Sequence, residues 1–149
     1  MPDPITLRHL GPDDLDLLLS VQDGLFDNPI LSDQARAFLD DPLHEMVLAI
    51  AGGQAVGMAS GMVMYHPDKP PMFFIAEVGV VEPFQRRGIA TQLCTELRAV
   101  AEARGCAGVW VATEGDNVPA RGLYTALGAR ETEGVVVYDW DDRAMDGGA

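Results

Sequence analysis

A basic, glycine-containing turn is the part of this chain best suited to hold a phosphate group. It reads Gln85-Arg86-Arg87-Gly88-Ile89-Ala90. The apolar run at 73–81 before it predicts a buried strand, and the periodicity of 89–103 after it predicts an amphipathic helix. A helix that begins here offers unpaired backbone N–H groups and the positive end of its dipole to an anion. Gly88 lets the backbone approach that anion without a Cβ in the way, and the two arginines add positive charge.

Glu77 is the one charged residue in the strand predicted at 73–81. A carboxylate in such a strand is costly unless it is paired or reached by water. It can form a salt bridge with a neighbouring arginine, which would be a structural role. It can instead lie at a cleft, bind an ammonium group and accept its proton, directly or through water. The sequence leaves both alternatives open.

The remaining elements are predicted from hydrophobic periodicity and from glycine and proline positions. Helix starts are expected at Asp13 and Ser32, each as a cap. Gly52-Gly53 predicts a hairpin turn, and the proline-rich stretch at 66–71 predicts a rigid loop. Pro119 near the start and Gly128 at the end delimit the last helix. Strands are predicted at 5–9, 46–51, 55–65, 73–81, 109–113 and 135–140, with helices after 12 and 32 and at 89–103 and 119–127.

The segment 85–90 resembles the acetyl-CoA-binding motif of the Gcn5-related N-acetyltransferase (GNAT) superfamily, Gln/Arg-x-x-Gly-x-Gly/Ala. Val78-Gly79-Val80 precedes it at the spacing that the family uses for the strand that pairs with pantetheine. The segments 117–120 and 123–129 resemble the family's Asn-x-x-Ala and Tyr-x-x-Leu-Gly-Phe block, with Ala129 where an aromatic residue is usual. The resemblance implies the α/β acyltransferase fold over a single domain at 1–149. Its mixed sheet is splayed at the cofactor strand and carries helices on both faces.

The resemblance also implies a reaction, the transfer of an acetyl group from acetyl-CoA to an amine. Glu77 would act as the base, and Tyr124 as the acid that protonates the departing thiolate, unless Tyr124 is an ordinary aromatic of its helix face. Asn117 would contact the cofactor, cap its helix, or do both. A backbone N–H at 78–80 could polarise the acetyl carbonyl. The residues expected to bind acetyl-CoA are Val78, Val80, Gln85, Arg86, Arg87, Gly88, Ile89, Ala90, Thr91, Asn117 and Tyr124.

The acceptor is suggested by a narrower resemblance to the type I aminoglycoside 3-N-acetyltransferases. The segments that carry it are 10–13, 54–57, 87–91, 123–128 and 138–141. Glu77 and Asp139 are the candidate substrate-binding residues. Val118 and Asn117 stand where that family carries acidic residues, and Glu77 stands where it carries Asp. Acetylation of a polyamine or of a peptide amine, or a module that binds acetyl-CoA without catalysis, are the alternatives.

The net charge of the chain indicates which binding partners to expect. The 149 residues have a formal net charge of −13, and Lys69 is the only lysine. Such a chain repels nucleic acid, so no nucleic-acid partner is expected. An acidic field attracts a cationic small molecule or a basic peptide, although solubility alone is an alternative explanation of the charge.

Composition and spacing set the remaining expectations. The apolar fraction of 48% is typical of a globular protein. No apolar run is long enough to cross a bilayer, and the first residues lack the pattern of a signal peptide. Cys94 and Cys106 lack paired spacing, which favours reduced thiols and a cytoplasmic location. The three histidines at 9, 44 and 66 lack ligand spacing, so no metal site is expected. A homodimer is an open alternative to a monomer.

Overall fold

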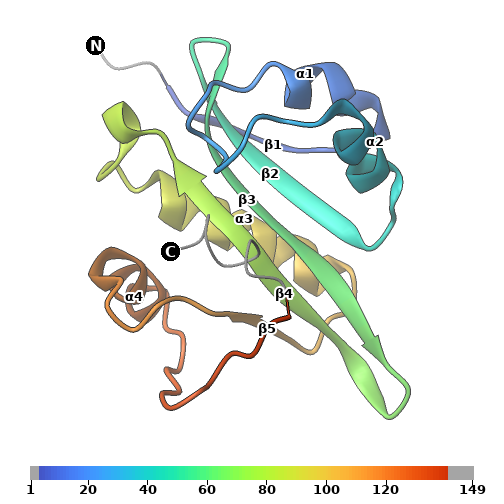
Figure 1. Cartoon of the computed structure of the whole chain (residues 1–149), viewed down its shortest axis with the longest axis vertical. Helices are drawn as coiled ribbons and strands as arrows, with labels where there is room; N and C mark the ends of the chain where they lie inside the picture. Colours follow the sequence, from blue (N-terminus) through green and yellow to red (C-terminus); the bar gives the residue numbers. More distant parts are fainter. Residues whose placement is uncertain (1–3, 141–149) are drawn as a thin grey trace. The chain divides into compact units, whose positions relative to one another are not determined.

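A computed structural model describes residues 4–140 of the chain (Figure 1). The chain divides into two compact units, one up to Ala112 and one that begins at Thr113. The first unit holds a five-stranded sheet and the helices packed on it. The second unit holds α4 (Val118–Ala126) and the residues that follow it.

The sheet of the first unit is mixed, as the sequence predicts. Its strand order follows the chain from β1 to β5. The first four strands pair antiparallel, whereas β4 and β5 pair in parallel because α3 (Ile89–Ala103) connects them. The strands are β1 (Thr6–His9), β2 (His44–Ala51), β3 (Gln54–His66), β4 (Lys69–Val80) and β5 (Gly108–Val111).

Helices and loops cover both faces of this sheet. A Cβ added to Gly57 of β3 would lie 3.0 Å from Leu93 and 3.1 Å from Ile89, so Gly57 faces α3. A Cβ added to Gly79 would lie 3.0 Å from the backbone oxygen of Leu25. Gly79 pairs with Met58, the residue after Gly57, so it faces the opposite side. That side is therefore covered by the segment between α1 (Leu15–Leu19) and α2 (Ser32–Asp40).

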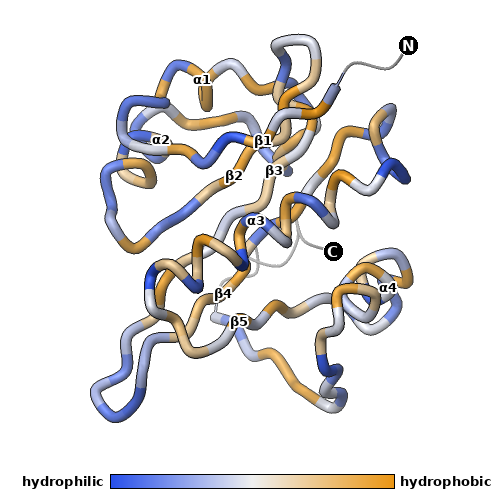
Figure 2. The backbone as a smooth tube through the Cα atoms, turned by 180° about the vertical axis from the view of Figure 1, so that it is seen from behind, coloured by the Kyte–Doolittle hydropathy of each residue, from blue (hydrophilic) through white to orange (hydrophobic). Residues whose placement is uncertain are grey.

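The helix α3 begins and ends where the sequence predicts. It lies along the sheet (Figure 1), and hydrophobic and hydrophilic residues alternate along it (Figure 2). Leu93, Leu97 and Ala101 are each 0% exposed against β2, β3 and β4. Burial of such side chains stabilises the fold by about 1.5–3 kcal/mol for each leucine. The beginning of α3 is therefore held in place by the packing of its apolar face.

The loop predicted at 66–71 is wrong, because β4 already begins at Lys69. His66 pairs with Lys69, and Met64 pairs with Met72. Between these pairs, Pro70 and Pro71 stand opposite the single residue at 65, which is a bulge. Proline lacks the N–H that a regular ladder needs and is accommodated where the pairing is interrupted. The two prolines therefore lie within a strand.

The strand predicted at 135–140 is also wrong, since the described residues there pair with no other strand. Two predicted caps differ as well. Leu31, not Ser32, precedes α2, and the carboxylate that accepts a bond from the Gly11 N–H (2.8 Å) belongs to Asp14 rather than Asp13. Pro119 at the start of α4 and Gly128 after it, with a φ of +84°, are as predicted.

The predicted acidic tail at 141–149 lies outside the described residues. Within the described part of the chain, no helix is long and apolar enough to cross a membrane.

The close packing of β3 on β4 leads to a stability prediction. A Cβ at Gly61 would overlap the backbone oxygen of Phe74 and the ring of Phe73. We expect Gly61→Ala to lower the free energy of unfolding by about 1–3 kcal/mol, because the core cannot yield space for a methyl group. Chemical denaturation would measure the change. The control is Gly122→Ala in α4, where a Cβ meets no atom within 4 Å, and an equal loss in both variants would contradict the prediction.

Candidate functional site

A β-bulge interrupts β4 immediately before Glu77. Ile75 pairs with Gly61, and Glu77 pairs with the preceding residue, Ser60. Two steps along β4 therefore match one step along β3, so that Ala76 is an extra residue. Such a bulge inverts the direction of the side chains beyond it relative to an uninterrupted strand.

The bulge also marks the point where β4 and β5 separate. The parallel pairing ends with Ile75 opposite Val111, while β4 continues to Val80. The backbone of 76–80 therefore has no β5 residue beside it among the described residues. This is the splayed sheet that the family resemblance implies, and within the described residues it leaves the outer edge of 76–80 without a strand partner.

The bulge turns Glu77 away from the core that packs on α3. Val78 and Val80 pair with Ala59 and Gly57, so they share the face that packs on α3. Glu77 pairs with Ser60, so it shares the opposite face with Gly79. In an uninterrupted strand it would instead share the face of Ile75, which is 3% exposed. The carboxylate therefore reaches solvent on the side covered by the segment between α1 and α2.

A second carboxylate, that of Asp27, acts on Glu77. Partial burial raises the pKa of Glu77 above its ordinary value, and the negative charge of Asp27 raises it further. No arginine within residues 4–140 forms an ion pair with Glu77, so the salt-bridge alternative has no partner in the described chain. A group with a raised pKa holds a proton more readily, which suits an acceptor of protons.

Asp27 is a residue that sequence reasoning missed. The segment 21–30 surrounds a depression of about 240 Å³ that is lined by its own residues, Asp23 and Asp27 among them. These residues have neither a repeat nor a motif spacing, and a tertiary contact of Leu25 with the sheet at Gly79 brings the segment to β4. A polar loop that ends in Asn28-Pro29 indicates a turn but not which strand the turn covers.

The turn before α3 has the backbone of an anion site. Arg86 has a φ of +65° and Gly88 a φ of +78°, and left-handed residues of this kind occur in backbone concavities that bind anions. The helix begins without a side-chain cap, with Gly88 as the residue before it. A Cβ at Gly88 would meet no atom within 4 Å. The side of Gly88 that a Cβ would occupy therefore faces open space, and the start of α3 is a candidate site for an anion.

Side chains hold this turn against β4. Gln85 donates from Nε2 to the backbone oxygen of Val80 (2.9 Å), and the Arg87 guanidinium lies 4.9 Å from the centre of the Phe84 ring. Ile89, the first residue of α3, is 2% exposed. Gln85 therefore positions the turn, and part of the hydrogen-bonding capacity of the Val80 backbone is already used. Ala90 is half-buried, and Thr91 is exposed beside it.

The other candidates lie in the second unit. Asn117 accepts a bond from the Ala120 N–H (3.1 Å), so it caps α4, which was one of its two expected roles. Tyr124 is half-buried in α4, and Asp139 is exposed. Arg121 connects α4 to the segment after it through Glu131 and Glu133, each at 3.0 Å.

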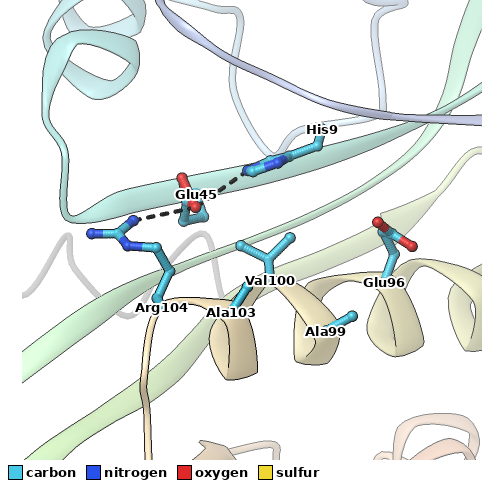
Figure 3. A pocket seen from close by; sticks show the side chains of 7 residues that line it. All are labelled: His9, Glu45, Glu96, Ala99, Val100, Ala103 and Arg104. Atoms are coloured by element: carbon cyan, nitrogen blue, oxygen red, sulfur yellow. Dashed lines mark hydrogen bonds and ion pairs between the residues drawn. The ribbon is translucent and has the colours of Figure 1, made fainter.

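The depression in Figure 3 lies elsewhere on the first unit. It is lined by residues of β1, β2 and α3 and by none of the motif. Within it, Glu45 lies 3.2 Å from His9 Nε2 and 3.3 Å from Arg104 Nη1. This cluster connects the end of α3 to the sheet, and the three side chains satisfy one another. Across residues 4–140, no group of three or more His, Cys, Asp or Glu could hold a metal ion.

Comparison with known proteins identifies the class to which this fold and turn belong. Residues 15–129 match the acetyltransferase (GNAT) family. The chain therefore belongs to the acetyltransferase (GNAT) family, as the sequence resemblance predicts.

Individual relatives give a narrower likeness. An aminoglycoside N(6')-acetyltransferase type 1 from Salmonella typhimurium strain LT2 is 28% identical over 116 residues, which cover 75% of this chain and 79% of the relative. AAC(6')-Iy, solved with a bisubstrate analog of CoA and acetylneamine, has a TM-score of 0.78 at 23% identity, covering 93% of this chain and 99% of its own. An aminoglycoside acetyltransferase from an uncultured soil metagenomic sample, solved with sisomicin, has a TM-score of 0.81 at 18% identity, with 92% and 95% covered. These solved structures share the fold of the chain.

The relatives do not confirm the 3-N type suggested by the short segments. The two relatives whose names give the acetylated position are both named for the 6' amine. The segments that suggested the 3-N type are short, and most of them lie in turns, at the start of α3 and in α4.

The juxtaposition of Glu77 and Asp27 leads to a prediction for titration. We expect the pKa of Glu77, followed by carbon NMR of its carboxyl group, to lie above the ordinary value of 4.5. Asp27→Asn should lower this pKa, because it removes a negative charge that disfavours the ionised form. Asp23→Asn is the matched control from the same loop, and it should leave Glu77 nearly unchanged. Equal shifts in both variants would show that Asp27 has no specific influence.

The same raised pKa has a consequence for stability. The folded chain binds the Glu77 proton more tightly than the unfolded chain does. The contribution of Glu77 to the free energy of unfolding therefore falls as the pH rises from 4.5 through the pKa of the folded state. We therefore expect the change in the free energy of unfolding caused by Glu77→Gln, measured by chemical denaturation, to be more favourable at neutral pH than below pH 4.5.

Proposed function

We propose that the chain transfers the acetyl group of acetyl-CoA to a primary amine of an aminoglycoside. The observation that carries this proposal is the bulge at Ala76. It presents the Glu77 carboxylate of β4 near Asp27, and the same strand leads into the turn at 85–88. One strand then supplies a cation site and an anion site. We further propose that 1–149 act as one catalytic domain.

The anion site is proposed to bind the pyrophosphate of acetyl-CoA. The backbone at 86–91 carries the positive end of the α3 dipole, and the space beside Gly88 is open. Arg86 and Arg87 are exposed beside it. The free edge of β4 at 76–80 suits pantetheine, with Val78 and Val80 offering backbone groups in the manner of an added strand. Asn117 is proposed to contact the cofactor from the start of α4, in addition to its capping bond.

Glu77 is proposed to bind the substrate ammonium and to take its proton. The neutral amine nitrogen then forms a bond to the acetyl carbon, with the carbonyl polarised by a backbone N–H of the β4 edge. The carbon–sulfur bond breaks, and the CoA thiolate takes a proton from the Tyr124 hydroxyl. The nitrogen of the new amide loses its extra proton to solvent, and the Tyr124 phenolate takes a proton back from solvent. Tyr124 belongs to the second unit, and its role rests on its place in the family motif.

Direct attack by the amine agrees with the state of the cysteines. Cys94 is 1% exposed, and burial raises the pKa of its thiol to about 11. Partial burial also raises the pKa of Cys106. Neither thiol is activated as a nucleophile, so an acetyl-cysteine intermediate has no suited residue within the described chain.

The acceptor is proposed to be a polycation that is acetylated at a 6'-type amine. Glu77 and Asp27 supply negative charge, and the formal net charge of −13 attracts a cation from a distance. The relatives named for the 6' position support this choice over the 3 position. Asp139 is proposed as a further contact to the substrate. A polyamine or peptide amine is the second candidate, because it carries the same charge.

The cofactor proposal leads to a matched pair of substitutions. Gly88→Ala should weaken acetyl-CoA binding, measured by calorimetry, by roughly 10-fold or more, which is the loss of about one charge-assisted hydrogen bond. The added methyl group stands where the phosphate approaches. Gly53→Ala is the control, since Gly53 also has a φ of +78° and no atom within 4 Å of an added Cβ. Backbone strain is thus equal, and equal affinities in both variants would locate the phosphate elsewhere.

The function itself is tested with a panel of amines and acetyl-CoA. We expect aminoglycosides to be acetylated, and NMR of the product to place the acetyl group at the 6' amine. Glu77→Gln should lower kcat/KM by roughly 10²–10⁴-fold, because the amine loses its base. Added salt should lower kcat/KM by screening the attraction.

Glu82→Gln is the control for Glu77→Gln, since Glu82 is an exposed carboxylate on the same approach to the turn. Acetyl-CoA affinity should be unchanged in both variants. If aminoglycosides and polyamines are inert while a neutral amine is acetylated rapidly, the proposed acceptor is wrong. If no amine reacts although acetyl-CoA binds, the chain is a binding module.

A further inference from the structure

Ser60 of β3 is the only polar or charged residue that is buried within residues 4–140, and it is 3% exposed. It pairs with Glu77 across β3 and β4, which lie side by side in Figure 1. Side chains of such paired residues point to the same face, with Cβ atoms about 4.5–5.5 Å apart. The bulge creates this pairing, because an uninterrupted register would place Ala76 opposite Ser60. The irregularity that directs Glu77 therefore also gives it a hydroxyl as its neighbour.

The Ser60 hydroxyl has no hydrogen-bond partner in the described chain. Within residues 4–140, the serine and threonine hydroxyls that donate hydrogen bonds to the protein are those of Ser20 and Thr95. A buried hydroxyl without a partner costs free energy that an alanine at the same place would not cost. Buried polar groups ordinarily have a partner, in the protein or in a bound molecule. The Ser60 hydroxyl therefore suits a partner that comes from outside the chain.

This hydroxyl opens toward the carboxylate. Among residues 4–140, the one fully buried side-chain polar atom without a partner is His44 Nδ1, so solvent reaches the Ser60 oxygen. Two neighbours of Ser60 on the same face, Met46 and Met58, are 4% and 2% exposed and close off their sides. Glu77, on the remaining strand, is exposed. A small polar group that approaches Glu77 can therefore contact the Ser60 oxygen as well.

We propose that Ser60 is a further contact of the acceptor amine. Its oxygen accepts one N–H of the ammonium group while the Glu77 carboxylate accepts another. Because the two side chains stand at paired positions, one nitrogen can lie within hydrogen-bond distance of both oxygens, about 2.7–3.2 Å. After Glu77 has taken its proton, the bond to Ser60 still holds the neutral amine in place for attack. The inference rests on the proposed function, because it assigns a second residue to the same amine.

The depth of Ser60 also selects the kind of amine. With a residue exposure of 3%, its oxygen is reached only by a small group. An ammonium on a methylene arm can enter, because the arm is narrow and the ring that carries it stays outside. An ammonium bonded directly to a ring brings the branched ring carbon to the same opening, beside the buried Met46. The preferred acceptor is therefore an aminomethyl group rather than an amine on a ring carbon.

Ser60→Ala in the full chain tests the contact, with acetyl-CoA and an aminoglycoside that carries an aminomethyl group. We expect kcat/KM for the amine to fall roughly 10- to 100-fold, the range for one hydrogen bond to a charged group. The affinity for acetyl-CoA should not change. The midpoint of chemical denaturation should not fall, because no hydrogen bond of the fold is lost. Ser32→Ala, at an exposed serine of α2, is the control and should leave kcat/KM unchanged.

An unchanged kcat/KM in Ser60→Ala would overturn the proposal while the proposed function stands. A loss of activity that is matched by a lower denaturation midpoint would assign the hydroxyl to the fold and would also overturn it. If the unsubstituted chain acetylates no amine, the proposed function fails and this inference fails with it. A double substitution then tests whether Ser60 and Glu77 bind one nitrogen. Ser60→Ala combined with Glu77→Gln should lose less than the product of the two single losses, and a loss equal to that product would contradict a shared contact.

A probe with both kinds of amine tests the selection. A cyclohexane that carries one amino group and one aminomethyl group offers a ring amine and an arm amine in the same dication. We expect NMR of the product to show the acetyl group on the arm, and Ser60→Ala to lower the proportion of this product. Ser32→Ala should leave the proportion unchanged. Acetylation of the ring amine by the unsubstituted chain, or equal product ratios in all three proteins, would overturn the assignment of Ser60.

Discussion

The register of β3 against β4 is the constraint on which the site depends. Side chains of paired strands alternate between two faces, so a single extra residue decides the face of every residue beyond it. With Ala76 inserted, Ile75 and Val78 both pack toward α3 and Glu77 faces away. If 75–77 instead ran as a regular strand, Glu77 would share the face of Ile75, and its carboxylate would enter the apolar layer beneath α3, at a cost of several kcal/mol unless it took up a proton. The bulge thus reconciles a charged residue with a packed central strand.

The turn at 85–88 depends on the same packing. Arg86 adopts a positive φ, which costs a residue with a Cβ about 1–2 kcal/mol. Such strain persists only where the surroundings hold it. Ile89, almost fully buried, fixes the helix that follows, and the Gln85 side chain fixes the strand before it by bonding to Val80. The turn is therefore held in place from both sides, which under the proposed function would prepare its backbone for the pyrophosphate.

The sequence predicts those features that depend on neighbouring residues in the chain. The period of 3.6 residues gives the bounds of α3, and Gly88 indicates the turn before it. The bulge at Ala76 could not be predicted, because it is a property of the pairing between two strands. Asp27 could not be predicted either, since its loop reaches β4 through a tertiary contact of Leu25. The segment 135–140 has strand propensity, but propensity without a partner strand in the described chain leaves it unpaired.

The proposed function also explains why an acidic chain keeps two adjacent arginines at one turn. With a net charge of −13, the long-range field opposes a polyanionic cofactor and favours a polycationic acceptor. Binding of the cofactor must then rest on short, directed contacts at the start of α3, which act within a few ångströms and are weakly screened. Salt therefore acts in opposite directions on the two substrates: it slows the approach of the cation and relieves the repulsion of the anion. The proposed function therefore implies that added salt lowers the association rate of the cationic acceptor and raises that of acetyl-CoA.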